Sequence, residues 1–174
     1  MDNLIDYRKF GAFCIDQGKQ FLNKATPVKK TVYSASQILT TLKNATNLDA
    51  NRIYSADEKH FTTNIDTWKT IIENDWTNKK TWVEDYFDCD NFAGSFSSYC
   101  ADIYGLNSAA LITVELRNPE TDKHIGYHRV CVIIDDKLQC WLLETQTDKM
   151  ILIEPGKPLV IDTWRYYPNY ITIN

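Results

Sequence analysis

The sequence predicts an α+β protein in which N-terminal helices precede an antiparallel sheet, with a helix bearing Cys89 packed on that sheet. In the first part of the 174-residue chain, apolar residues recur at three- and four-residue spacing, which is typical of amphipathic helices. After Gly105 the pattern changes to short apolar runs separated by turn residues. Because those connections are short, we expect antiparallel pairing.

Three segments carry helical spacing together with capping residues. The first covers residues 34–45 behind a serine cap, and the second covers residues 65–76. The third begins around Cys89 and ends before Gly105, a natural helix stop. Following its apolar stripe places Cys89 at the N-terminal end of the buried face, so its thiol should point toward whatever the helix packs against.

The rest of the chain is expected to form the sheet. The predicted strands cover residues 110–116, 127–134, 138–147 and 150–154. The tail, 159–174, should add one more strand and an irregular covering segment. Since the chain shows no internal repeat or composition break, we expect a single domain over residues 1–174 with its core at about 65–154.

Composition and charge exclude several classes of partner. With 19 Lys and Arg against 23 Asp and Glu, the formal charge is −4, which disfavours electrostatic binding to nucleic acid or to an anionic membrane. No apolar run approaches the roughly 20 residues that cross a bilayer. Asp2 and Asp6 stand where a signal peptide would carry positive charge. The expected location is therefore cytoplasmic or associated with an assembly.

The five cysteines are odd in number and widely spaced, which favours free thiols in a reducing compartment over a disulfide framework. Four of them are expected to be buried packing residues: Cys14, Cys100, Cys131 and Cys140.

A zinc site built from His128, Cys131 and Cys140 is disfavoured. Side chains alternate along a strand, so His128 and Cys131 should lie on opposite faces and could not converge on one ion. The other two histidines, His60 and His124, sit in polar stretches and are expected to be solvated.

One set of residues is suited to nucleophilic chemistry. Cys89 opens a helix, where unpaired backbone N–H groups and the helix dipole favour thiolate over thiol. His128 begins a strand and Glu144 ends the next one, each with apolar neighbours on its face. If residues 135–137 form a three-residue loop, His128 lies directly opposite Glu144. A two-residue turn would place Leu143 there instead and break the pairing.

Packing the Cys89 helix on the face that carries His128 and Glu144 would align nucleophile, base and orienting carboxylate. The indole N–H of Trp82 is a weaker candidate for stabilising an oxyanion, and Trp82 also fits a core or cleft-wall position. Cys89 and His128 each have an ordinary structural interpretation as well, as core filler and as a hydrogen-bonded buried histidine.

These residues resemble a family. The segment 82–93 (WVEDYFDCDNFA), with His128 and Glu144 following it, is similar to the papain-like and transglutaminase-like cysteine proteases, and most of all to the C-terminal protease domain of the Marasmius oreades agglutinin and its relatives. The resemblance covers about residues 65–154. It implies Cys89 as nucleophile, His128 as base, Glu144 as third member and Trp82 as an oxyanion-side residue.

The resemblance also bears on cofactors. The agglutinin group contains calcium-activated proteases, which implies a calcium ion beside the site with Asp88, Asp90 and Gln146 as nearby oxygen donors. Asn91 stands where relatives often have a second acid, which weakens that implication. The residues of this chain do not themselves require a cofactor.

Two functions follow as hypotheses. The leading one is a thiol-dependent hydrolase or acyltransferase, a cysteine peptidase or amidase that acts on an amide bond of a peptide or protein substrate. The alternative is a catalytically silent structural or interaction protein of a larger assembly, for example a virion component. The aromatic-rich tail and the lone domain motivate the second hypothesis.

Overall fold

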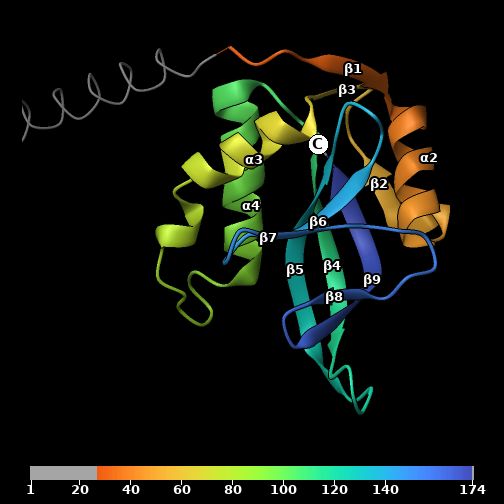
Figure 1. Ribbon diagram of the computed structural model, residues 1–174, viewed down its shortest axis with the longest axis vertical. Helices are drawn as coiled ribbons and strands as arrows, with labels where there is room; N and C mark the ends of the chain where they lie inside the picture. The colour runs from red at the N-terminus through yellow and green to blue at the C-terminus, as the bar shows by residue number, and fades with distance from the viewer. Residues whose placement is uncertain (1–26, 174) are drawn as a thin grey trace, which may run out of the picture.

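The computed structural model describes residues 27–173 and shows an α+β fold, in which three α-helices flank a mixed sheet (Figure 1). The helices are α2 (Ala35–Thr46), α3 (Ile65–Asn74) and α4 (Cys89–Tyr99). A single π-helical turn, Cys100–Tyr104, prolongs α4 as far as Gly105, whose left-handed backbone (φ 61°) ends it. All three predicted helices are confirmed. The prediction for Cys14 lies outside the described residues.

The main sheet has seven strands in the order β2-β9-β4-β5-β6-β7, and β8 pairs with β9. Their bounds are β2 Ile53–Ser55, β4 Ala109–Arg117, β5 His124–Ile134, β6 Cys140–Glu144, β7 Lys149–Leu152, β8 Leu159–Ile161 and β9 Trp164–Ile173. The pairs from β4 to β7 are antiparallel as predicted, whereas β2 runs parallel to β9. The sheet is therefore mixed, and it takes strands from both sides of residues 65–154.

A second, two-stranded sheet joins β1 (Thr31–Ser34) to β3 (Lys59–Thr62). The sequence pattern did not predict these strands or β2. In β3 the buried positions alternate, and they include His60, which is fully buried. The expectation that His60 is solvated is therefore wrong: its ring bonds to Ser55 Oγ at 2.8 Å and to the Asn107 carbonyl at 3.4 Å.

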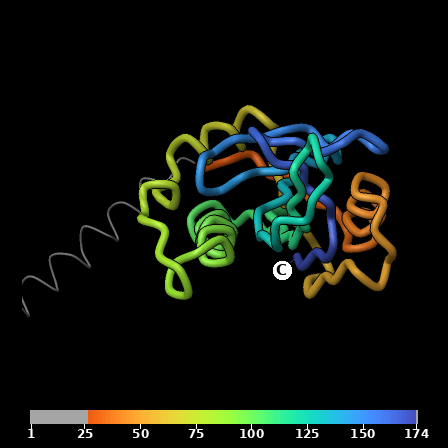
Figure 2. The backbone as a smooth tube through the Cα atoms, turned by 90° about the horizontal axis from the view of Figure 1, so that it is seen from below, coloured from red at the N-terminus to blue at the C-terminus, as the bar shows by residue number. Residues whose placement is uncertain are grey.

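Helices cover both faces of the sheet (Figures 1 and 2). On one face α2 packs through Ile38 and Leu42 against a core that includes Val132. On the other face α3 and α4 pack through residues such as Trp68 and Phe96. Because successive residues of β5 point to opposite faces, each helical layer meets a different set of β5 side chains.

No helix among residues 27–173 is long and apolar enough to cross a membrane.

Candidate functional site

Cys89 is the first residue of α4, and a reciprocal cap fixes that helix start. The Asp88 carboxylate accepts from the backbone N–H of Asp90 at 3.4 Å, and the Asn91 amide oxygen accepts from the backbone N–H of Asp88 at 3.2 Å. The half-buried Cys89 thiol therefore lies at the positive end of the helix dipole.

His128 and Glu144 are hydrogen-bonded, with Nε2 and Oε2 2.7 Å apart. Glu144 is buried, and two further groups hold its carboxylate: Tyr166 donates its hydroxyl to Oε2 at 3.2 Å, and the Gln146 backbone N–H donates to Oε1 at 3.3 Å. The expected pairing of imidazole and carboxylate is therefore present. Tyr166 is a member of the cluster that sequence reasoning missed, because β9 is brought to it only by the tertiary fold.

The strand register that produces this pair differs from the predicted one. Ile134 pairs with Cys140 and not with Leu138, so the connection is longer than three residues. The buried carboxylate of Asp135 explains the longer loop, because it accepts from the backbone N–H groups of Lys137 and Gln139, each at 2.9 Å.

The register change shifts the pairing by two residues, which leaves every side chain on its expected face. Continuing the observed pairing would set Glu144 opposite Val130, so His128 is its diagonal neighbour. Diagonal positions lie about 7–8 Å apart, within reach of a long side chain.

The expected packing of α4 is also wrong. The helix packs on the face that carries Cys131, Ile133 and Leu143, where the Cys131 thiol donates to the Ala93 carbonyl at 3.4 Å. His128 and Glu144 belong to the alternate positions, on the face whose core contains Val130 and Leu142.

Cys89 approaches His128 beyond the end of the β5–β6 ladder. It does not approach from above the sheet face that carries His128 and Glu144. β6 pairs with β5 only between Cys131 and Ile134, so the stretch of β5 around His128 and Arg129 lies beyond the end of this ladder. Hydrogen bonding to His128 and to the Arg129 backbone N–H lowers the pKa of Cys89. The start of α4 is therefore close to that stretch of β5.

The electrostatics of the cluster favour a thiolate beside an imidazolium. Hydrogen bonding with His128 is the main cause that lowers the pKa of Cys89, against the opposing effects of burial and the charge of Asp88. Burial alone would lower the pKa of His128, but hydrogen bonds and charges from Cys89 and Glu144 outweigh it and raise that pKa to about 9. The arrangement can therefore hold a nucleophilic sulfur.

The remaining described cysteines behave as the predicted packing residues. Cys100, Cys131 and Cys140 are buried, and burial raises the pKa of each thiol, for Cys140 to about 12. His124 is half exposed, as expected.

Trp82 lies in the connection between α3 and α4 and is 51% exposed. The short segment around it turns through a single bridge between Val83 and Phe87, and Tyr86 at its tip is 79% exposed. No hydrogen bond joins the Trp82 indole to any residue in 27–173, and its role as an oxyanion-side residue stays a prediction.

One of the calcium donors suggested by the resemblance, Asp88, already uses its carboxylate to accept a hydrogen bond. Asp88 and Asn91 form the cap of α4, and the backbone of Gln146 is bonded to Glu144. Within the described part of the chain, no group of three or more His, Cys, Asp or Glu side chains is placed to hold a metal ion. The calcium expectation for Asp88, Asp90 and Gln146 stays a prediction.

An open groove of about 540 Å³ runs along the outer side of α4. Small side chains form its floor at Gly94, Ser95 and Ser98, with Asp90 and Asn91 toward one end and Asp102 and Ile103 toward the other; Trp76 and Tyr99 complete it. Space above Gly94 is free, since a Cβ there would meet no atom within 4 Å. The run of small residues in α4 is the sequence signal that could have indicated this groove.

Comparisons with known proteins connect the fold to lectins. Two solved lectin structures match 81% of the chain at 14% sequence identity. One is Polyporus squamosus lectin bound to the epitope Neu5Acα2-6Galβ1-4GlcNAc, with a TM-score of 0.56, and the other is a complex of PSL1a with E64, with a TM-score of 0.55. The chain spans about half the length of these lectin chains. No protein-family model and no curated protein matches.

These findings correct the identification as a papain-like or transglutaminase-like protease of the agglutinin group. One of the matching structures is described as Polyporus squamosus lectin bound to a glycan epitope. The expected cysteine peptidase or amidase function, a hydrolase with a catalytic triad, is corrected with it. The presence of Cys89, His128 and Glu144 does not by itself establish an enzymatic activity, because one fold can host both binding and catalytic proteins. The non-catalytic alternative agrees better with the lectin neighbours.

Proposed function

We propose that this chain is a non-catalytic interaction protein that binds a neutral oligosaccharide in the groove along α4. The observation that carries the proposal is the combination, in one open groove of about 540 Å³, of an exposed indole, carboxylates and hydroxyl groups. Ligand sites are typically concave, with an apolar surface and a few polar groups that fix orientation.

Each lining group suits one part of a sugar. The Trp76 ring, 48% exposed, offers a flat apolar surface for the C–H face of a pyranose. Asp90 and Asp102 are carboxylates and accept hydrogen bonds from sugar hydroxyls, while Ser95 and Ser98 can donate or accept. The small floor at Gly94 lets a ring approach the helix closely.

The charge of the groove favours a neutral ligand. Asp90 and Asp102 place two negative charges along it, and an acidic sugar would be repelled by both. The Lys80 ammonium is nearby, 3.9 Å from the centroid of the Trp76 ring, and also lies over Phe87 at 4.3 Å. Lys80 is thus engaged with aromatic rings, and we expect it to compensate only part of that repulsion.

The lectin neighbours support carbohydrate as the ligand class, since one of them is bound to a sialylated glycan. At 14% identity the likeness concerns the fold, and the matched region is about half of that lectin, so the ligand and its position here rest on the groove itself.

The test is saturation-transfer NMR with the full chain and two glycans, neutral Galβ1-4GlcNAc and its α2-6 sialylated form. We expect the neutral glycan to bind more tightly. Gly94→Trp fills the groove and should abolish binding, whereas Gly94→Ala adds one methyl group in free space and should retain it. Trp76→Ala should weaken binding at least tenfold.

Absence of transfer to any neutral glycan, or equal binding by Gly94→Trp and Gly94→Ala, would refute the groove as a sugar site. Circular dichroism of each variant distinguishes lost binding from lost folding.

For the residues predicted as a catalytic set, we propose only that Cys89 is reactive. Cys89 would react with soft electrophiles, with the charge of His128 holding the thiolate and Glu144 orienting the imidazole. The oxyanion-side role of Trp82 stays a prediction. A papain-like or transglutaminase-like core likewise remains an untested refinement of the α+β fold.

A further inference from the structure

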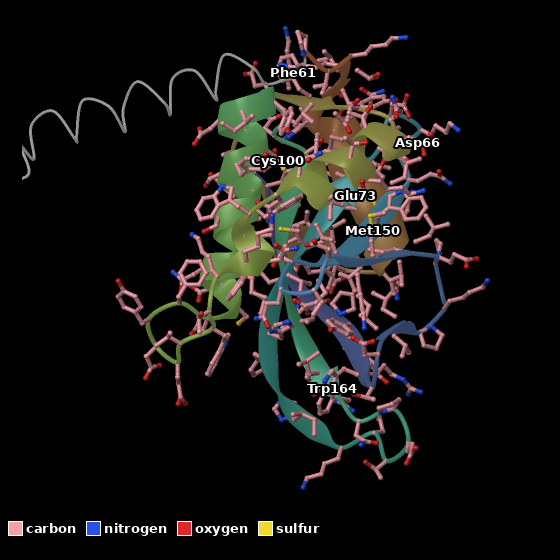
Figure 3. The ribbon with its side chains drawn as sticks, turned by 60° about the vertical axis from the view of Figure 1, so that its left-hand side comes forward. Phe61, Asp66, Glu73, Cys100, Met150 and Trp164 are labelled. Atoms are coloured by element: carbon pink, nitrogen blue, oxygen red, sulfur yellow. The ribbon has the colours of Figure 1, made fainter. Side chains whose placement is uncertain are left out.

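The sheet face on which α4 packs is open where the long strands extend past that helix. β4, β5 and β9 continue beyond the start of α4, toward the end of the sheet where Trp164 begins β9 (Figure 3). The core under α4 includes Cys131 of β5. The next two side chains of β5 on the same face are Arg129, which is half-buried, and Tyr127, which is exposed. The open face therefore begins beside the start of α4.

The strand register aligns the side chains of this face in rows across the three strands. Arg129 pairs with Thr113, and Thr113 pairs on its other side with Tyr170. In the next row Tyr127 pairs with Glu115. Paired residues point to the same side of a sheet, so the arginine shares one surface with two tyrosines that are 65% and 41% exposed. Tyrosine and arginine are enriched at protein interfaces and at their energetic hot spots.

Arg129 has no acidic partner among residues 27–173. Its Nε and Nη2 groups donate only to the neutral Thr113 hydroxyl, at 3.3 and 3.4 Å. Arg117 on the same face is paired, with Glu115 at 2.8 Å and with Asp122 at 3.0 Å. Within the described residues the Nη1 group of Arg129 makes no hydrogen bond, so the guanidinium has N–H donors to offer to a carboxylate.

The charges of this face leave a local positive excess. Arg165 lies 3.6 Å from Asp122, so Glu115 and Asp122 together offset Arg117 and Arg165, while the charge of Arg129 is not offset. This excess is opposite in sign to the formal charge of the whole chain, which is −4. Charge complementarity therefore favours an acidic group as the occupant of this face.

We propose that this open face is an interaction surface for an acidic segment of a partner protein. A carboxylate side chain of the partner binds the Arg129 guanidinium, whose planar fork matches a carboxylate, and neighbouring apolar groups pack on the rings of Tyr127 and Tyr170. A sheet face offers an extended surface, which suits a protein segment better than a small ligand. The glycan groove lies along the outer side of α4, so the two proposals can fail separately.

The test uses the full chain and two blocked synthetic tetrapeptides. One has two glutamates between two phenylalanines, and the other has glutamines in place of the glutamates. The readout is the NMR signal of the Arg129 Nε–H group, assigned with Arg129→Gln. We expect the acidic peptide to shift this signal in a saturable way, and the glutamine peptide to bind about tenfold more weakly because it cannot form a charge-assisted hydrogen bond.

Three variants locate the binding, followed through the backbone amide signals of β5. Arg129→Gln should weaken binding of the acidic peptide about tenfold. Arg165→Gln is the matched control: it removes the same charge from the same face, but Arg165 already lies beside Asp122, so binding should be nearly unchanged. Tyr127→Ala should weaken binding of both peptides and leave the preference for the acidic one.

Equal binding of the two peptides by the wild type, or equal losses in Arg129→Gln and Arg165→Gln, would overturn the proposal. Acetate binding as tightly as the acidic peptide would overturn it too, because the face would then be a simple anion site. Urea unfolding of each variant separates lost binding from lost folding. If Arg129→Gln fails to fold, the wild-type preference between the peptides and the exposed Tyr127 still decide the outcome.

Discussion

Replacing Glu144 with Gln should lower the pKa of His128 from about 9 toward its ordinary value of 6.5. Burial opposes the imidazolium, and the bonds and charges of Cys89 and Glu144 overcome it. The side chain of His128 is only 14% exposed, so solvent screens these interactions little. The difference between 6.5 and about 9, at about 1.4 kcal/mol per pKa unit, corresponds to about 3 kcal/mol in favour of the charged ring.

The sign of the effect on stability follows from that direction. Since the pKa of His128 is higher in the folded protein than in the unfolded chain, its contribution is complete below about pH 6.5 and is lost as the pH rises through about 9. Urea unfolding of the wild type at pH 6 and pH 9.5 should show this loss. In Glu144→Gln the loss should be smaller, and comparing the two proteins at each pH cancels the groups they share.

The assay is an NMR titration of the histidine ring protons, with His128→Asn used to assign the resonance. A wild-type pKa of His128 near 6.5 would refute the reasoning, and so would a pKa of about 9 that survives in Glu144→Gln. The hydrogen bond from Tyr166 to Glu144 gives a second readout, because Tyr166→Phe removes a donor to the carboxylate without removing its charge.

Two further changes have definite expected outcomes. Iodoacetamide should alkylate Cys89 in the folded protein at a pH below the ordinary thiol range, because hydrogen bonding with His128 lowers the pKa of Cys89. His128→Asn should move the midpoint of this pH dependence upward. Mass spectrometry measures the alkylation, and an unchanged midpoint would contradict the expectation. Ser34→Ala removes the capping box of α2 and should lower the free energy of unfolding in urea by about 1 kcal/mol, whereas Ser36→Ala, two residues further along in the first turn, is the milder control.

The helices could be predicted because their signals are local. Ser34 and Asp88 cap α2 and α4 within three residues of the groups they bind, and Gly105 supplies the left-handed stop. Apolar spacing then identified the buried sides correctly, including Phe96 on α4. Everything needed for these predictions lies within the helical segment itself and its two ends.

The missed strands depend on distant partners. β2 has three residues and exists as a strand because Ile53 pairs with Ile171, at the other end of the chain. Strands this short carry too few residues to show alternation. The burial of His60 was missed for a similar reason. Glu58 and Lys59 precede it in the sequence, whereas in space its ring bonds to Ser55 and to the Asn107 carbonyl.

The sequence contains the charged and polar residues of the candidate groove, but it does not show that they line the same groove. Asp90 and Asp102 lie at different ends of the helical segment, and Trp76 belongs to a separate connection. Only the path of residues 75–80 alongside α4 brings them together, and no periodic pattern specifies that path.

The cluster of Cys89, His128 and Glu144 shows how a correct contact can come from an incorrect geometry. The predicted register was wrong by two residues, and two is the period of a strand, so Glu144 kept its face and could still reach His128 along the diagonal. An error of one residue would have placed Leu143 there. The predicted sheet face on which α4 packs was wrong as well, yet Cys89 approaches His128 because β6 stops before it would cover that part of β5. The length of the loop held by Asp135 therefore sets where the β5–β6 ladder ends, and with it whether thiol, imidazole and carboxylate can meet.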